Sequence, residues 1–150
     1  MSSVNPLMKE LENAAPGHDV ALADLLDAAR WNSEGLIPAI AQQFDSGEVL
    51  MMAWMNRAAL EETLASGRVC YWSRSRDKAW RKGESSGQVQ LLRDAFLDCD
   101  GDTLLLKVDQ TGPACHTGRR SCFYTALESD RARVATAPLM TAEELYGSHH

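Results

Sequence analysis

The chain has 150 residues, of which 45% are hydrophobic and 24% charged, a composition typical of one ordinary folded domain. Its net charge of −6 argues against general binding to nucleic acid, whose backbone attracts clustered positive charge. No apolar run is long enough to predict a membrane span, and no basic segment followed by an apolar stretch predicts a secretory signal. We therefore expect a cytoplasmic protein that binds neither membranes nor nucleic acids.

The N-terminal region predicts little regular structure before its first helix. Residues 1–18 are mixed in composition and contain Pro6 and Gly17, so we expect a loose arm there. Residues 19–30 carry apolar side chains at helical spacing and predict a short amphipathic helix. This helix ends before a predicted turn at residues 32–35.

A strand–turn–strand pattern comes next. Two apolar runs, residues 36–43 and 48–55, flank the turn sequence DSG (45–47) and predict a β-hairpin. Pro38 lacks a backbone N–H group, so we expect the first strand to lie at a sheet edge there, or to begin there.

The following segment has the signals of a capped helix. Asn56 is a suitable N-cap, and Gly67 suits the left-handed turn that ends many helices. Leu60 and Leu64 are four residues apart, so they lie on one face of the helix predicted between the two caps.

The second half of the chain is predicted to be mainly strand and loop. The sequence DG (100–101) is typical of a hairpin turn, and it joins a predicted strand at 88–98 to an antiparallel partner at 103–109. The other predicted elements are a strand at 69–73, polar loops at 74–87 and 110–120, a strand at 121–127 and a weak helix at 141–146.

These elements predict an α+β fold. Because strands and helices do not alternate regularly, a parallel doubly wound sheet is not expected. We predict a β-rich single domain with an antiparallel sheet or pseudo-barrel and two or three short helices. Its expected parts are an N-terminal arm and helix (1–30), a core (31–127) and a C-terminal tail (128–150), whose last residues (147–150) resemble the start of an expression tag.

Three carboxylates are spaced two residues apart in the sequence DCDGD (98–102). On an extended strand end, Asp98, Asp100 and Asp102 point to one side, because side chains alternate with period two. Oxygen ligands of this kind suit Mg²⁺ or Ca²⁺. An EF-hand is excluded, because its sixth and twelfth places do not hold the required glycine and glutamate. The alternative is an acidic hairpin tip surrounded by water.

Cysteine side chains offer a separate and softer set of ligands. Cys99 is expected to point away from the three carboxylates, and Cys115 and Cys122 lie in or just after the loop rich in glycine and proline. In a reducing cytoplasm, three thiolates with an open fourth position are typical of catalytic zinc. Alternatively, Cys99 and Cys122 are small buried residues in strands. Cys70 has no such neighbours and is assigned to the core.

His116 directly follows Cys115 and has two interpretations. It can bind zinc itself, or it can give and take protons beside the metal. Because ligation by two adjacent residues is strained, we favour the second role and name His116 the candidate catalytic residue.

The segment YWSRSRDKAWRKGESSG (71–87) combines cations with glycine and serine. Arginine binds phosphate oxygens in pairs, and glycine lets backbone N–H groups approach phosphate, so the segment is a candidate phosphate site. Tyr71, Trp72 and Trp80 are candidates for stacking on a base. The P-loop pattern is absent, and the alternative is a solvated loop with its aromatic residues in the core. The candidate phosphate contacts are Arg74, Arg76, Lys82, Ser85 and Ser86.

Taken together, these segments resemble the phosphoribosyl-AMP cyclohydrolase family. The resemblance covers about residues 31–124 in order, and the combination of its last two motifs is highly specific. The matching segments are LIPAIAQ (36–42), EVLMMAWMN (48–56), YWSRSR (71–76), WRKGESSG (80–87), DCDGD (98–102) and GPACHTGRRSCF (112–123).

The resemblance implies an enzyme of histidine biosynthesis that hydrolyses the N1–C6 bond of the adenine ring of 1-(5-phosphoribosyl)-AMP with zinc-activated water. It implies zinc on Cys99, Cys115 and Cys122, and magnesium on the three aspartates. It also implies a homodimer, in which Cys99 of one subunit joins the other two cysteines of its partner. Some relatives carry a fused pyrophosphohydrolase domain, for which this chain is too short, so we expect a monofunctional enzyme.

Two other classes of function stay open at this point. A zinc-stabilised interaction module would use four protein ligands and lose its fold on chelation, without any turnover. A nucleotide sensor would bind phosphates through residues 74–87 and leave the adenine ring unchanged.

Overall fold

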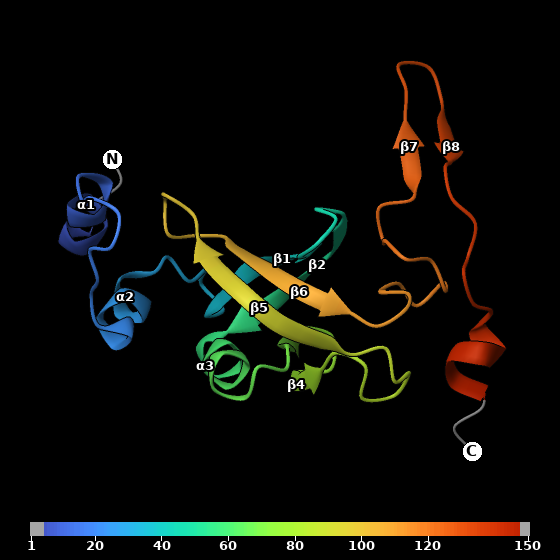
Figure 1. Cartoon of the computed structure of the whole chain (residues 1–150), viewed down its shortest axis with the longest axis horizontal. Helices are drawn as coiled ribbons and strands as arrows, with labels where there is room; N and C mark the ends of the chain where they lie inside the picture. Colours follow the sequence, from blue (N-terminus) through green and yellow to red (C-terminus); the bar gives the residue numbers. More distant parts are fainter. Residues whose placement is uncertain (1–4, 148–150) are drawn as a thin grey trace.

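The computed structural model of the chain describes residues 5–147 and contains a six-stranded sheet with short helices beside it (Figure 1). The tag-like residues 148–150 lie outside the described part. The strand order in the sheet is β4-β3-β2-β1-β6-β5. The strands are β1 (Leu36–Gln43), β2 (Val49–Asn56), β3 (Cys70–Ser73), β4 (Lys78–Arg81), β5 (Gln90–Leu97) and β6 (Leu104–Gln110).

The sheet is mixed rather than wholly antiparallel. The β1–β2 and β5–β6 hairpins are antiparallel, as predicted. Between them, β1 pairs with β6 in parallel, and Ala39 lies opposite Leu104. Hairpin signals do not predict this contact, because the two strands belong to different hairpins and lie far apart in the sequence. The predicted α+β class is confirmed.

The sheet curls until the edge strand β5 meets the segment before β3. Val69 N donates to Gln90 O at 3.1 Å, and Leu92 N donates to Gly67 O at 2.7 Å. These bonds join parts of the sheet that are far apart in the strand order. The predicted pseudo-barrel is therefore confirmed as a partly closed sheet, a half-barrel.

Pro38 shows how this sheet accommodates a proline in a central strand. It is the third residue of β1 and pairs with Trp54 of β2, whereas the pairing of β1 with β6 begins one residue later, at Ala39. At Pro38, β1 is therefore paired on one side, so the missing N–H group costs no ladder bond to β6. The prediction of a local edge is confirmed.

Alternating apolar side chains fill the interior of the half-barrel. Along β6, Leu104, Leu106 and Val108 are buried, while the residues between them are partly exposed. Full burial of such a side chain contributes about 1.5–3 kcal/mol. Tyr71 of β3 is also fully buried, and its hydroxyl donates to Gln90 Oε1 at 2.8 Å. Tyr71 is thus a core residue, and the prediction that it stacks on a base is wrong.

The helix α3 (Arg57–Ser66) begins and ends at the predicted residues. Asn56 Oδ1 accepts a hydrogen bond from Ala59 N at 2.9 Å, which satisfies one of the unpaired donors of the first turn. Gly67 has a φ of +77° and donates its N–H group to Thr63 O. These local signals fix both ends of the helix.

The N-terminal arm is more ordered than predicted. The helix α2 (Leu22–Ala28) lies within the expected range, but α1 (Pro6–Glu12) forms where a loose arm is expected. Asn5 Oδ1 accepts from Leu7 N at 2.8 Å and caps α1, and Pro6 occupies the first turn, where its missing N–H group costs nothing.

The C-terminal part of the chain forms a second, two-stranded sheet of β7 (Thr125–Leu127) and β8 (Ala132–Val134), which projects away from the six-stranded sheet (Figure 1). The predicted strand at 121–127 is therefore too long, and β8 is not predicted. A short π-helix, η1 (Glu143–Gly147), follows where the weak helix is expected. None of the helices between residues 5 and 147 has the length and apolar character needed to cross a membrane.

Candidate functional site

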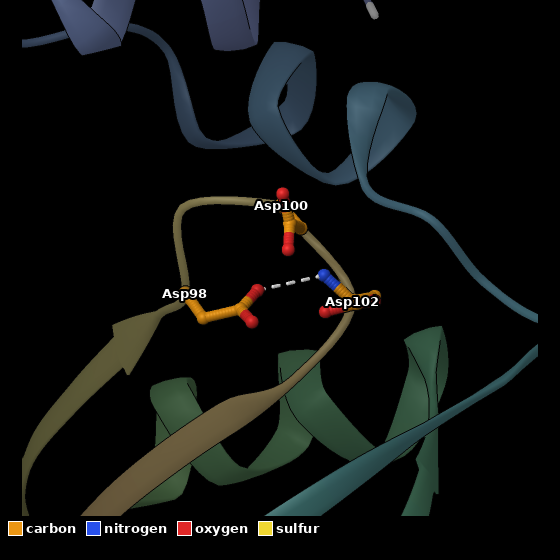
Figure 2. Close-up of side chains that lie close together, drawn as sticks. All are labelled: Asp98, Asp100 and Asp102. Atoms are coloured by element: carbon orange, nitrogen blue, oxygen red, sulfur yellow. Dashed lines mark hydrogen bonds between the residues drawn. The ribbon is translucent and has the colours of Figure 1, made fainter. Parts of the chain in front are cut away.

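The three predicted carboxylates gather in the turn between β5 and β6 (Figure 2). Asp98, Asp100 and Asp102 present oxygen atoms that all lie within 4.8 Å of one another. Asp98 Oδ1 accepts hydrogen bonds from the backbone N–H groups of Asp102 at 2.9 Å and Thr103 at 3.3 Å. The carboxylates thus come together as predicted, but a tight turn brings them there and the expected extended strand end is wrong.

Hydrogen bonds within this turn, together with the proximity of like charges, separate two of the carboxyl groups in pKa. Desolvation raises the pKa of Asp98, but backbone hydrogen bonds, chiefly from Asp102, outweigh this effect and lower the pKa. A hydrogen bond with Asp98 and the charge of that carboxylate raise the pKa of Asp102. A divalent cation would relieve this repulsion, and oxygen-only ligands suit a hard cation such as Mg²⁺. The three residues therefore fit the metal expected from the sequence.

Cys115 and Cys122 lie side by side after the opposite end of β6. Cys115 N donates to Arg119 O at 3.1 Å, which folds the loop between the two cysteines back on itself. Cys122 N donates to Leu50 O at 2.7 Å and ties the end of this loop to β2. As a result, the two cysteines lie close enough for each thiol to affect the pKa of the other.

The two sulfurs of this pair differ in acidity. Desolvation opposes ionisation of Cys115, but Thr117 Oγ1 donates to Cys115 Sγ at 3.1 Å, and the net effect lowers the pKa of Cys115. Cys122 keeps an exposed surface as a residue, yet protein atoms surround its sulfur, and this desolvation raises the pKa of Cys122 to about 12. A soft cation that binds two neighbouring thiols displaces their protons to solvent, so the pair fits zinc.

Cys99 lies in the acidic turn and is exposed. The seven residues of β6 separate this turn from the cysteine pair, a length of about 20 Å, and Figure 1 shows the two segments at opposite ends of the strand. Within residues 5–147, the three aspartates are the only group of three or more potential ligands gathered within 4.8 Å. The three cysteines therefore do not meet within one copy of the chain.

The other expectations for the cysteines are also decided by burial. The alternative in which Cys99 and Cys122 are buried strand residues is wrong, because both are exposed and neither lies in a strand. Cys70 is buried in β3, as predicted. His116 is exposed, so its imidazole is accessible to a substrate beside the cysteine pair.

A hollow of about 160 Å³ gathers four of the five predicted phosphate contacts at the end of β4. These four residues are Arg76, Lys82, Ser85 and Ser86. Trp80 also lines this hollow, so it stays available for stacking. Arg74 lies elsewhere: its guanidinium carbon is 4.8 Å from the centre of the Trp54 ring. Arg74 and Trp72 line a separate hollow of about 400 Å³.

Lys82 connects the basic hollow with the cysteine pair. Its Nζ donates to Ala114 O at 2.6 Å, and Ala114 directly precedes Cys115. Burial lowers the pKa of Lys82, while the nearby Cys122 and Cys115 act in the opposite direction. The ammonium group is therefore directed to the cysteine loop, although the sequence predicts it as a phosphate contact.

Three supporting residues of the cysteine loop are missing from the sequence-based prediction. Thr117 bonds the Cys115 sulfur, Arg120 Nη1 donates to Gly112 O at 2.6 Å, and Gln110 Nε2 donates to the carbonyl of the following residue at 2.9 Å. Two of the three lie inside the motif GPACHTGRRSCF, so position within the motif is the signal that could have identified them.

Comparison with known proteins identifies close relatives of the chain. The sequence model of a family described as phosphoribosyl-AMP cyclohydrolase matches residues 51–124, which include the acidic turn and the cysteine pair. A phosphoribosyl-AMP cyclohydrolase of Chromohalobacter salexigens is 78% identical over 139 residues, which cover 93% of this chain and 95% of that relative. Relatives with the same name from Alkalilimnicola ehrlichii and Hydrogenovibrio crunogenus are 67% and 62% identical. They match 93% and 92% of this chain, and 99% and 94% of their own lengths.

Proposed function

Because the chain belongs to the phosphoribosyl-AMP cyclohydrolase family, we propose that it opens the adenine ring of 1-(5-phosphoribosyl)-AMP at a zinc site completed by two copies of the chain. The reaction is a hydrolysis of the N1–C6 bond and a step of histidine biosynthesis. Cys115 and Cys122 hold the metal together with Cys99 of the partner subunit. The observation that carries this proposal is the folded loop that brings Cys115 and Cys122 close enough to affect each other's pKa, with an exposed imidazole beside Cys115.

The residues around the cysteine pair have distinct tasks in the proposed reaction. When bound, zinc lowers the pKa of water from about 16 to about 7, which makes a nucleophile available at neutral pH. His116 takes a proton from the attacking water and returns it to N1 as the C6–N1 bond breaks. Arg76, Ser85 and Ser86 bind a substrate phosphate through charge-assisted hydrogen bonds.

Magnesium is proposed on the acidic turn. Asp98, Asp100 and Asp102 supply three carboxylate oxygens, and magnesium held by carboxylates commonly binds substrate phosphates. When bound there, magnesium would neutralise charge on a substrate phosphate.

The separation of the ligands supports a homodimer. Cys99 is about one strand length from the cysteine pair, so a zinc ion with three thiolate ligands requires a second copy of the chain. Because such a site requires reduced cysteines, we propose the cytoplasm as its compartment.

The direct test is incubation of the purified protein with phosphoribosyl-AMP while the ultraviolet absorbance of the purine is followed. We expect ring opening that stops when a chelator removes the metal and returns when zinc is added. Binding of the nucleotide with unchanged absorbance would instead support the sensor. Loss of the fold on chelation, with no turnover before it, would support the zinc-stabilised module.

Two variants test the assigned roles, with a third as control. Cys115→Ala is expected to lose both zinc and activity, whereas Cys70→Ala removes a buried thiol of β3 that is not among the proposed ligands and should keep both. His116→Ala is expected to keep zinc and to lose about 10²- to 10⁴-fold in rate. Full activity in His116→Ala would remove the histidine from proton transfer, and zinc retained by Cys115→Ala would contradict the proposed ligand set.

A further inference from the structure

Lys82 has a position that phosphate binding alone does not explain. It lies at the rim between the basic hollow and the cysteine loop, and its side chain is half-buried. Its Nζ donates to Ala114 O at 2.6 Å. Ala114 is itself buried and is bonded to Cys115, so this hydrogen bond fixes the backbone that carries a sulfur ligand.

The hydrogen bond to Ala114 O also brings the charge of Lys82 close to the pair. Against the larger effect of burial, both Cys122 and Cys115 favour its charged form and raise its pKa. Arg119 is a second cation near Cys115, but its Nε donates to Thr136 O and its guanidinium carbon lies 4.0 Å from the centre of the Tyr124 ring. Among the described groups, Lys82 is the cation whose charge lowers the pKa of the Cys122 thiol. A dication with three thiolates carries one net negative charge, and a half-buried cation close by stabilises such a charge more than one in water does.

We propose that Lys82 is a positioning residue of the zinc site, which strengthens metal binding by holding the Ala114 carbonyl and by balancing the charge of the Cys115–Cys122 pair. This inference rests on the proposed function, because it concerns the same cysteine ligands. It differs from phosphate binding in its consequence: loss of the ammonium group weakens the affinity for zinc, and the KM for the nucleotide stays unchanged.

The experiment measures the zinc dissociation constant by competition with a chromogenic chelator at one neutral pH, together with kcat and KM for phosphoribosyl-AMP. Partners of metal ligands typically contribute 10- to 100-fold to metal affinity, so Lys82→Met is expected to bind zinc about 10- to 100-fold more weakly. Lys82→Arg keeps the positive charge and should recover most of this loss. Lys82→Gln keeps a donor for the Ala114 carbonyl without the charge, so it separates the two contributions.

Two control variants make the result specific. Lys78→Met removes an exposed lysine of β4, the strand that ends just before Lys82, and should bind zinc as the unmodified protein does. Arg76→Met removes a cation of the basic hollow, and it should raise KM without changing the zinc affinity. Together they separate a general loss of positive charge from loss of the charge beside the sulfurs.

The outcomes are distinguishable. Zinc affinity in Lys82→Met equal to that of the unmodified protein would overturn the inference, and a raised KM with unchanged zinc affinity would make Lys82 a phosphate contact. If Lys82→Met fails to fold, Lys82→Gln supplies the same comparison. Failure of the unmodified protein to bind zinc through its cysteines would instead overturn the proposed function.

Discussion

Gly118 joins the cysteine loop to the C-terminal tail, and its replacement by alanine tests that packing. The residue has a φ of +86°, and its carbonyl accepts hydrogen bonds from Leu139 N at 2.8 Å and Met140 N at 3.3 Å. A Cβ atom at Gly118 would lie 1.8 Å from Met140 O. Because that neighbour is backbone, the tail has to move away, and the two hydrogen bonds are lost with it.

We expect Gly118→Ala to lower the free energy of unfolding by about 3–4 kcal/mol. The left-handed backbone costs a non-glycine residue about 1–2 kcal/mol, and each lost hydrogen bond costs about 1 kcal/mol. Gly67 is the matched control, because its φ is +77° but an added Cβ meets no atom within 4 Å. Gly67→Ala should therefore lose only the backbone contribution, about 1–2 kcal/mol.

The measurement is urea unfolding followed by tryptophan fluorescence, with the free energy of unfolding extrapolated to water for both variants. We expect the free energy of unfolding to fall with urea concentration at a similar slope in both variants. The urea concentration at the midpoint should fall further in Gly118→Ala than in Gly67→Ala. Zinc affinity should fall in Gly118→Ala as well, because Gly118 N donates to Cys115 O at 3.0 Å. Equal losses of stability in the two variants would refute the packing of the tail on Gly118.

Three further substitutions test the fold and the acidic turn. Asn56→Ala removes the hydrogen bond to Ala59 N and should destabilise the protein by about 1 kcal/mol. Asn56→Ser keeps a side-chain oxygen for the cap and should retain most of this stability. Equal urea midpoints for the two variants would contradict the cap. Tyr71→Phe leaves the buried Gln90 Oε1 without its donor and should cost about 1–3 kcal/mol, so an unshifted midpoint would count against this buried pair. Asp100→Asn should raise the magnesium concentration needed for half-maximal activity, and an unaltered magnesium response would reject the proposed ligand.

Elements with local signals could be predicted from the sequence. α3 lies between the predicted caps, and the β1–β2 and β5–β6 hairpins follow from turn residues between apolar runs. The signals for α1 are also local, since Asn5 caps it and Pro6 occupies its first turn. Proline and glycine also occur in loose segments, but at Pro6 the preference of proline for the first turn of a helix agrees with the structure.

Elements that depend on distant partners could not be predicted. β4 is a four-residue strand with a cation at each end, and its pairing with β3 places Lys78 opposite Ser73 at the sheet edge. Its sequence alone is typical of a solvated loop, because an edge strand needs no alternating apolar pattern. The parallel pairing of β1 with β6 has the same origin: it depends on how two separate hairpins pack together.

The candidate site also has parts that the sequence predicts and parts that depend on distant contacts. The three aspartates come together because they share one turn, so their spacing was enough to predict the cluster. The direction of Lys82 could not be predicted, because it depends on a contact with Ala114, which is 32 residues away in the sequence. The burial of Tyr71 depends likewise on the closure of the half-barrel against Gln90.

The cysteines of the proposed zinc site differ in how the fold holds them. Backbone hydrogen bonds to Arg119 and Leu50 fix Cys115 and Cys122 in place before any metal arrives. Cys99 lies in an exposed turn at the other end of β6, beside the three aspartates. On the proposed arrangement, each zinc ion links the prepared pair of one copy to Cys99 of the partner subunit, so metal binding and subunit association stabilise each other. In the same proposed arrangement, the acidic turn of one copy would lie near the cysteine loop of the other, and a nucleotide bound between them would have carboxylates on one side and the cations of the basic hollow on the other.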